Sequence, residues 1–133
     1  MPDTDRSSSS RGRILVADDE PHIRRILATI LESGGFLVDQ AEDGTEALER
    51  LRGDASYRMA LLDIAMPGLT GLEILQELHP LPHREDLVVV ILTAKGQDAD
   101  REAAFHLGAH EFVTKPFSPK KLLARIDQLL PGP

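Results

Sequence analysis

The chain contains no cysteine, and it has no long run of apolar residues. Without cysteine there can be no disulfide framework, no thiolate zinc site and no cysteine nucleophile, and the composition fits a cytoplasmic protein. The longest apolar stretches are far too short to cross a bilayer, so we expect no membrane span and no membrane partner.

A concentrated basic face is also missing. The chain has 15 Lys and Arg against 22 Asp and Glu, with a formal net charge of -7. Domains that hold nucleic acid by its phosphates usually carry clustered positive charge, so direct binding of nucleic acid is not expected. Histidine offers little more: prolines separate His79 from His83, and Gly108 lies between His106 and His110. Neither pair is predicted to share a helical face as metal ligands do, and we interpret all five histidines as surface or filling residues.

The first twelve residues lack the apolar core that a signal peptide requires, and they include four serines in succession. We therefore predict that residues 1–12 form a disordered N-terminal arm. The remaining length suits one compact unit with a single core, so residues 13–131 are predicted to be one domain.

From Arg13 onward, short apolar runs alternate with amphipathic stretches, a pattern typical of a parallel sheet with crossover helices. The predicted strands are 13–17, 36–40, 59–62, 87–92 and 111–114. The predicted helices run from Pro21 to a stop at 33–35, over 44–51, from 70 or 71 to 78, over 98–107, and from a Ser118 cap to 130. The fold class is therefore α/β.

The run 87–92 is continuously apolar, as in a strand that is covered on both faces. Right-handed crossovers with helices on both faces favour a flavodoxin-like (βα)5 doubly wound sheet, five-stranded and parallel, with strand order 2-1-3-4-5. In such a sheet, ligands bind beyond the carboxyl ends of the strands, at the switch point between strands one and three.

Polar residues stand at four of these strand ends. They are Asp18 and Asp19, then Asp63, Thr93 and Lys115. Several carboxylates in one small volume repel each other unless a cation or protons intervene. An all-oxygen ligand set without histidine or cysteine favours a hard divalent ion, and a site with few carboxylates suits Mg²⁺.

Asp63 can act as a nucleophile on phosphorus when a metal ion and a cation cancel the repulsion between two anions. The ammonium of Lys115 can pair with Asp63 and then with a phosphoryl oxygen, and the hydroxyl of Thr93 can donate to another. Each residue also has an ordinary explanation: Asp19 as a helix cap, Thr93 as a strand former, Lys115 as a solvated lysine. Their joint placement on one rim favours the catalytic interpretation.

Four segments carry a resemblance to a known family. They are Ile14-Leu15-Val16-Ala17-Asp18-Asp19-Glu20, Leu62-Asp63-Ile64-Ala65-Met66-Pro67 with Gly71 beyond, Ile91-Leu92-Thr93-Ala94, and Lys115-Pro116-Phe117. Together they resemble the response-regulator receiver domain of two-component signalling, from Arg13 to about Leu130.

The resemblance implies that Asp63 is the phosphoacceptor, and that Thr93 and Lys115 bind the phosphoryl group. It implies that Mg²⁺ is bound by Asp18, Asp19, Asp63 and the main-chain carbonyl of Ala65, and that the Lys115-Pro116 peptide is cis. The implied partners are a histidine kinase or phosphotransfer protein and a downstream protein or output domain. The domain would catalyse only its own phosphorylation and dephosphorylation and would not otherwise be an enzyme.

Phe112 matches the switch aromatic of the family, and its alternative role is that of a core phenylalanine. We favour the switch, because the last strand is an edge strand whose side chains can face solvent. Phosphorylation would bias the segment after Thr93, the helix over 98–107 and Phe112. The sequence near 108–112 and 124–126 also resembles regulators that dimerise through this face, with Glu111 and Arg125 as a pair across the interface.

The sequence disfavours three other interpretations of these residues. A phosphohydrolase of the haloacid-dehalogenase type needs a second aspartate two residues after the first, where this chain has Ala65. A flavodoxin-like nucleotide or flavin module needs a phosphate-cradling loop after the first strand, where this chain has Asp18 and Asp19. A receiver relative that binds metal without taking phosphate is disfavoured because Asp63, Thr93 and Lys115 are all present.

Overall fold

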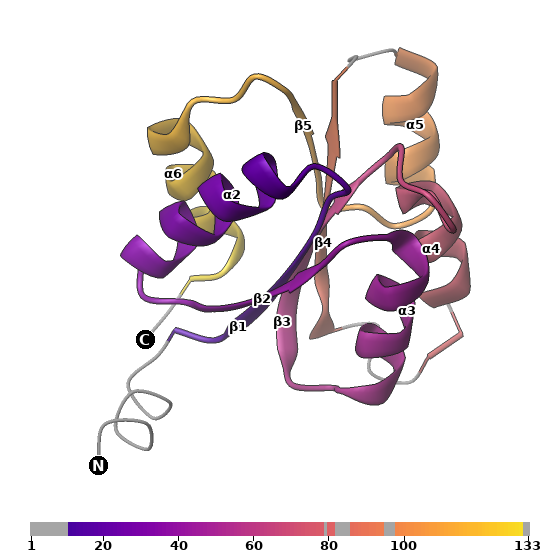
Figure 1. Cartoon of the computed structure of the whole chain (residues 1–133). Helices are drawn as coiled ribbons and strands as arrows, with labels where there is room; N and C mark the ends of the chain where they lie inside the picture. Colours follow the sequence, from indigo (N-terminus) through magenta and orange to yellow (C-terminus); the bar gives the residue numbers. More distant parts are fainter. Residues whose placement is uncertain (1–10, 79, 82–85, 95–97, 132–133) are drawn as a thin grey trace.

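The computed structural model describes residues 11–78, 80–81, 86–94 and 98–131, and it contains a parallel five-stranded sheet. The strands are β1 (Arg13–Ala17), β2 (Leu37–Ala41), β3 (Tyr57–Asp63), β4 (Val88–Thr93) and β5 (Glu111–Thr114). Their order is β2-β1-β3-β4-β5, which confirms the predicted topology (Figure 1). The switch point therefore lies between β1 and β3.

Helices follow the strands in alternation. They are α2 (Pro21–Ser33), α3 (Gly44–Gly53), α4 (Gly71–Leu78), α5 (Asp98–His106) and α6 (Pro119–Leu129). Pro21 and Pro119 stand in first helical turns, where a missing N–H costs nothing. The predicted Ser118 cap is confirmed, since its hydroxyl accepts from the N–H of Lys121 at 3.2 Å.

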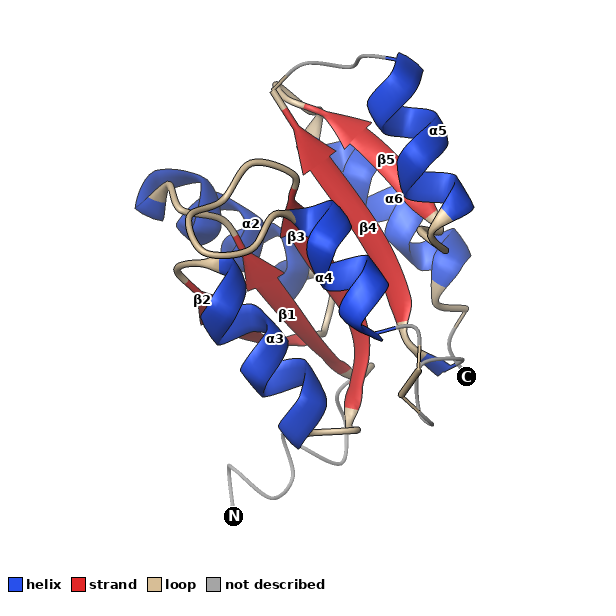
Figure 2. Ribbon diagram, turned by 90° about the vertical axis from the view of Figure 1, so that its right-hand side faces the viewer, coloured by secondary structure: helices blue, strands red, loops and turns tan. Residues whose placement is uncertain are grey.

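The helices cover both faces of the sheet (Figures 1 and 2). On one face α2 and α6 pack with Leu27, Leu31, Leu122 and Ile126 against the sheet. On the other face α3, α4 and α5 contribute a second apolar cluster with Leu48, Ile74, Leu75 and Ala104. β4 is buried at all positions after Val88, as expected of a strand that is covered on both sides.

Two strands extend further than their apolar runs. β3 begins at Tyr57, which pairs with Arg13, and ends at Asp63, which pairs with Leu92. β4 likewise includes Thr93, opposite Thr114. These polar residues are the last members of the ladder rather than the first residues after it, so ladder hydrogen bonding restricts their backbones.

The body of the domain also engages residues that the sequence analysis assigned to the arm. The N–H of Arg11 donates to the carbonyl of Gly35 at 2.9 Å, and its guanidinium donates to Asp127 at 2.5 Å. Residues 1–10 of the predicted arm lie outside the described residues. No helix in the described part of the chain has the length and apolar character needed to span a membrane.

Candidate functional site

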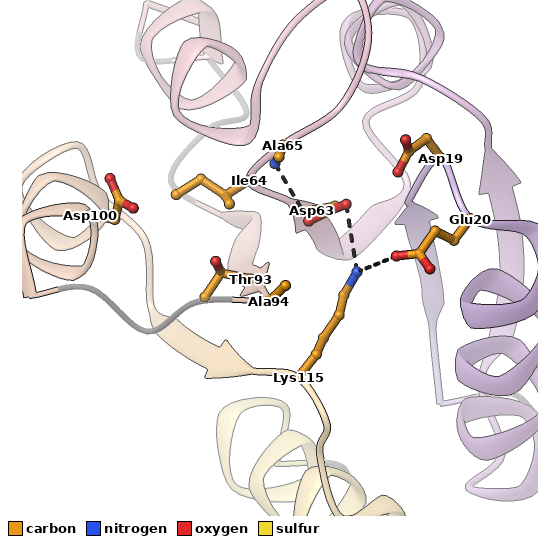
Figure 3. Close-up of a pocket in the computed structure, with 9 residues that line it drawn as sticks. All are labelled: Asp19, Glu20, Asp63, Ile64, Ala65, Thr93, Ala94, Asp100 and Lys115. Carbon is orange, nitrogen blue, oxygen red and sulfur yellow. Dashed lines mark hydrogen bonds and ion pairs between the residues drawn. The ribbon is translucent and has the colours of Figure 1, made fainter.

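The polar strand ends lie together on one rim of the sheet. Asp18 follows β1, Asp63 ends β3, Thr93 ends β4 and Lys115 follows β5. Because parallel strands present their carboxyl ends at the same edge, residues distant in sequence converge there (Figure 3). The sequence-based expectation that these side chains share one crevice agrees with this arrangement.

Lys115 is the centre of the charge network. Its Nζ donates to Asp18 Oδ2 at 2.7 Å, and it lies 3.5 Å from Glu20 Oε1 and 3.6 Å from Asp63 Oδ2. Figure 3 shows the ammonium between Asp63 and Glu20. Burial alone would lower the pKa of Lys115, but the hydrogen bond to Asp18 and the charges of Asp63 and Glu20 raise it. The site thus holds a charged ammonium among three carboxylates.

Asp63 is a buried carboxyl, with 5% of its surface exposed. Burial raises the pKa of Asp63 to about 6, reinforced by the negative charge of Asp18, while Lys115 and the N–H of Ala65 pull it down. Gly71 keeps the start of α4 close behind it, since a Cβ there would stand 3.0 Å from the Asp63 carbonyl oxygen. Because the Asp63 carboxyl is buried and close to Asp18, its ionised form is disfavoured unless a further cation binds.

The loop between β1 and α2 presents three acids. Asp18 is fully buried, whereas Asp19 and Glu20 are exposed. The N–H of Glu20 donates to Asp18 Oδ1 at 2.9 Å. Asp19 does not cap α2. The N-cap position of this helix is occupied by Glu20, whose side chain makes no capping hydrogen bond. The alternative role of Asp19 as a helix cap is therefore wrong.

The donor set fits a hard divalent cation. One carboxylate oxygen from each of Asp18, Asp19 and Glu20 lies within 4.8 Å of the others. Asp63 is not part of that close set and faces it across the ammonium of Lys115. Oxygen ligands alone, two of them solvent-accessible, match a Mg²⁺ ion that keeps several waters.

A cavity of about 470 Å³ opens above these groups. It is lined by Asp19, Glu20, Asp63, Ile64, Ala65, Thr93, Ala94, Asp100 and Lys115. Asp100, in the first turn of α5, was not identified from the sequence, because an acid at a helix start is usually a solvated one. Its carboxylate adds a further acidic group to the wall of the cavity.

Other predicted residues have definite positions. The Lys115-Pro116 peptide is cis, as the resemblance implied. Phe112 is 6% exposed and packs in the same apolar cluster as Ala104, so its ring faces the core in this structure. The Nε of Arg125 donates to Glu111 within the same chain, so these two residues are already paired without a second copy.

The histidines lie away from the cavity as far as they are described. His110 is exposed, as predicted for a surface residue, and its Nδ1 accepts the N–H of Val89 at 3.1 Å at the opposite end of β4. His79 and His83 lie outside the described residues.

Comparison with known proteins gives consistent matches. Residues 14–127 match a family model described as response regulator receiver domain. The chain is 38% identical over 118 residues to the transcriptional regulatory protein ResD of Bacillus subtilis, covering 89% of this chain and 48% of ResD. It is 39% identical over 118 residues to the phosphate regulon transcriptional regulatory protein PhoB of Escherichia coli, covering 89% of this chain and 51% of PhoB. The chain spans about half the length of the curated relatives it matches.

Solved structures agree in fold. The response regulator TrrA of Thermotoga maritima, in complex with Mg²⁺-BeF, aligns with a TM-score of 0.79 and 36% identity over 90% of this chain and 99% of TrrA. The chemotaxis protein CheY4 of Vibrio cholerae aligns with a TM-score of 0.82 and 26% identity, covering 90% of this chain and 98% of CheY4.

Proposed function

This chain belongs to the response regulator receiver domain family, and we propose that Asp63 accepts its phosphoryl group from a histidine kinase or a phosphotransfer protein. One observation carries the assignment: the Lys115 ammonium stands 3.6 Å from Asp63 Oδ2 in a cavity that is open to a donor. A buried carboxylate that attacks an anionic phosphoryl group needs such a counter-charge. The proposed receiver domain extends over residues 13–131, and Arg11 and Gly12, which the sequence assigned to the end of the arm, are hydrogen-bonded to it.

The transfer requires little covalent chemistry from the protein. An Asp63 oxygen attacks phosphorus, the bond from phosphorus to the donor imidazole nitrogen breaks, and the nitrogen leaves with the electron pair. The three phosphoryl oxygens then need positive charge or donors. Lys115 supplies an ammonium and Thr93 a hydroxyl, both from the wall of the same cavity.

Mg²⁺ is the cofactor that the donor set fits. Its proposed ligands are Asp18, Asp19, Asp63 and the main-chain carbonyl of Ala65. Asp18 and Asp19 belong to the close set of carboxylates, and Asp63 faces that set across the Lys115 ammonium. When bound, the ion neutralises the charge that spreads over phosphoryl oxygens during transfer. Without the ion, the Lys115 ammonium is hydrogen-bonded to Asp18 and reduces the repulsion among the carboxylates.

The output of the switch is a change of the face formed by α5, β5 and α6. Thr93 and Phe112 are the proposed switch residues, because the first lines the cavity and the second packs with α5. The relatives ResD and PhoB are named as transcriptional regulators and are about twice as long as this chain. We therefore assign control of a downstream protein or output domain to this face, with no enzymatic activity beyond self-phosphorylation and its reversal. The absence of cysteine supports a cytoplasmic location.

Phosphorylation-dependent pairing of two copies through the same face belongs to this proposal. The exposed ring of Phe105 on α5 supplies an apolar contact group, and the exposed side chain of Arg125 on α6 supplies a polar one. Sedimentation at high concentration, with and without a phosphoryl mimic, tests it. Two monomeric samples would rule out the homodimer and leave the phosphoacceptor role intact.

Intact-mass measurement tests the central assignment. After incubation with Mg²⁺ and acetyl phosphate or phosphoramidate, we expect one phosphoryl adduct on the native protein and none on Asp63→Asn. Asp86→Asn is the matched control, since Asp86 is an exposed acid before the amino end of β4, at the opposite edge of the sheet. A native protein without adduct, or an adduct that persists in Asp63→Asn, would refute the proposal.

A further inference from the structure

Arg24 is a buried arginine beside the acidic loop, and the phosphoryl-transfer chemistry described above does not use it. It lies on α2 with 9% of its surface exposed, although the neighbouring Arg25 on the same helix is exposed. Its Nη1 donates to the main-chain carbonyl oxygen of Asp18 at 2.6 Å. A guanidinium taken out of water needs strong partners, so this contact is the first candidate for its role.

The other partner of Arg24 is weak. Its Nη2 lies 3.9 Å from Glu42 Oε1, at the limit of an ion pair, and the Glu42 side chain is 78% exposed. Exposed pairs of this kind contribute little. The short bond to Asp18 is therefore the contact that the buried position serves.

Hydrogen bonds hold both the main chain and the side chain of Asp18. Its N–H donates to the carbonyl of Ala41 at 3.3 Å, and its own carbonyl accepts from Arg24. Its two carboxylate oxygens accept from the N–H of Glu20 at 2.9 Å and from Lys115 at 2.7 Å. Of these contacts, the bond from Arg24 is the one that orients the peptide between Asp18 and Asp19. It therefore sets the direction in which Asp19 and Glu20 continue from β1.

We propose that Arg24 is a positioning residue for the metal-binding acids: its bond to the Asp18 carbonyl holds the loop so that the carboxylates of Asp18 and Asp19 converge. The inference rests on the proposed function, because it takes Mg²⁺ as the ion that these carboxylates bind. Groups that orient metal ligands from behind commonly change metal affinity by about 10–100-fold when they are removed.

The charge of Arg24 and its positioning role predict opposite results. A cation close to the acids repels Mg²⁺, so loss of the charge alone would tighten binding of the ion. Loss of the bond to the Asp18 carbonyl lets the acidic loop relax and would weaken binding. The direction of the change in Mg²⁺ affinity therefore separates the two effects, and it does so without any phosphoryl donor.

The experiment is calorimetric titration of the folded protein with Mg²⁺ alone. We expect Arg24→Gln to bind Mg²⁺ about tenfold more weakly than the wild type. Arg25→Gln is the matched control, since it removes the same charge from the exposed side of α2 and should change the affinity less than about twofold. Unchanged or tighter binding by Arg24→Gln would overturn the proposal.

A second variant keeps the test decisive if Arg24→Gln does not fold. Arg24→Met keeps a long unbranched side chain but removes both the charge and the donor, so a charge-only role predicts tighter binding of Mg²⁺ and a positioning role predicts weaker binding. Unchanged or tighter binding by Arg24→Met would refute positioning. Failure of the proposed function has a different signature: the wild type itself would bind no Mg²⁺ or take no phosphoryl group on Asp63.

Discussion

Replacement of Asp63 by asparagine should stabilise the metal-free protein. Asp63 is almost fully buried, and its pKa is raised from 3.8 to about 6 by burial and by the charge of Asp18. The ionised carboxylate is therefore a cost to the folded state at neutral pH. The amide removes that charge, and Lys115 keeps Asp18 and Glu20 as partners.

The size of the effect follows from linkage. A carboxyl whose folded-state pKa lies above its unfolded value binds its proton more tightly when folded, so its contribution to stability is present below 3.8 and is lost as pH rises to about 6. A difference of about 2 pKa units at about 1.4 kcal/mol each gives about 3 kcal/mol. Asp63→Asn should therefore gain about 3 kcal/mol at about pH 8 and well under 1 kcal/mol at about pH 4.

Urea unfolding in EDTA, at both pH values, measures this gain. Asp19→Asn is the control, because Asp19 is an exposed acid of the same rim and its substitution should change the free energy of unfolding by less than about 1 kcal/mol. Addition of Mg²⁺ should stabilise the wild type more than Asp63→Asn and so reduce the difference between them. The reasoning fails if the gain is absent at about pH 8, or if it is equally large at about pH 4.

Three further changes probe the same neighbourhood. Lys115→Met should destabilise the metal-free protein by about 3 kcal/mol, because it leaves the buried carboxylates of Asp18 and Asp63 without their cation. Urea unfolding in EDTA measures this loss, and a free energy of unfolding equal to that of the wild type would contradict it. Gly44→Ala should lower the free energy of unfolding by at least about 1 kcal/mol, because the new Cβ would stand 1.8 Å from the carbonyl oxygen of Leu69 and must displace the loop after Asp63. An unchanged urea midpoint would argue against that close approach. Asp100→Asn should speed phosphorylation by acetyl phosphate about twofold to fivefold at low salt, since it removes an anion from the cavity wall. Glu102→Gln, on the exposed side of α5, is the control, and a similar gain in that variant would show that the position of Asp100 is irrelevant.

The sequence predicts the fold well because apolar runs and amphipathic stretches alternate along it. The same rule places the strand-end residues in one crevice, since parallel strands deliver their carboxyl ends to one edge. It fails at strand ends that are polar: Asp63 and Thr93 belong to the ladder, and hydrophobicity alone does not mark them as strand residues. The one-residue shifts at the carboxyl ends of β3 and β4 have this cause.

The residues that sequence reasoning missed are charged side chains on helices. Arg24 lies on the buried face of α2 with Leu27 and Leu31, but its charge argues against a core position; the hydrogen bond that the carbonyl of Asp18 accepts makes its burial possible. Asp100 reaches the cavity only because α5 packs beside β4 and β5. Glu111 and Arg125, assigned to two copies of the chain, meet within one because β5 and α6 are neighbours. Each depends on a contact between elements that local sequence does not encode.

The proposed switch role of Phe112 involves α5, because the Phe112 ring packs with that helix. β5 is an edge strand, so the sequence suggested that its side chains could face solvent, but α5 covers the edge and the Phe112 ring is buried in one cluster with Ala104. Among the described side chains of α5, Ala104 is the one that is buried, so the helix has little apolar surface to lose when it shifts. Withdrawal of the Phe112 ring alone would leave a cavity, which is costly unless α5 moves to fill it. We therefore infer that α5 and Phe112 move together, and a phosphoryl mimic that changed amide exchange in α5 but not in β5 would contradict this coupling.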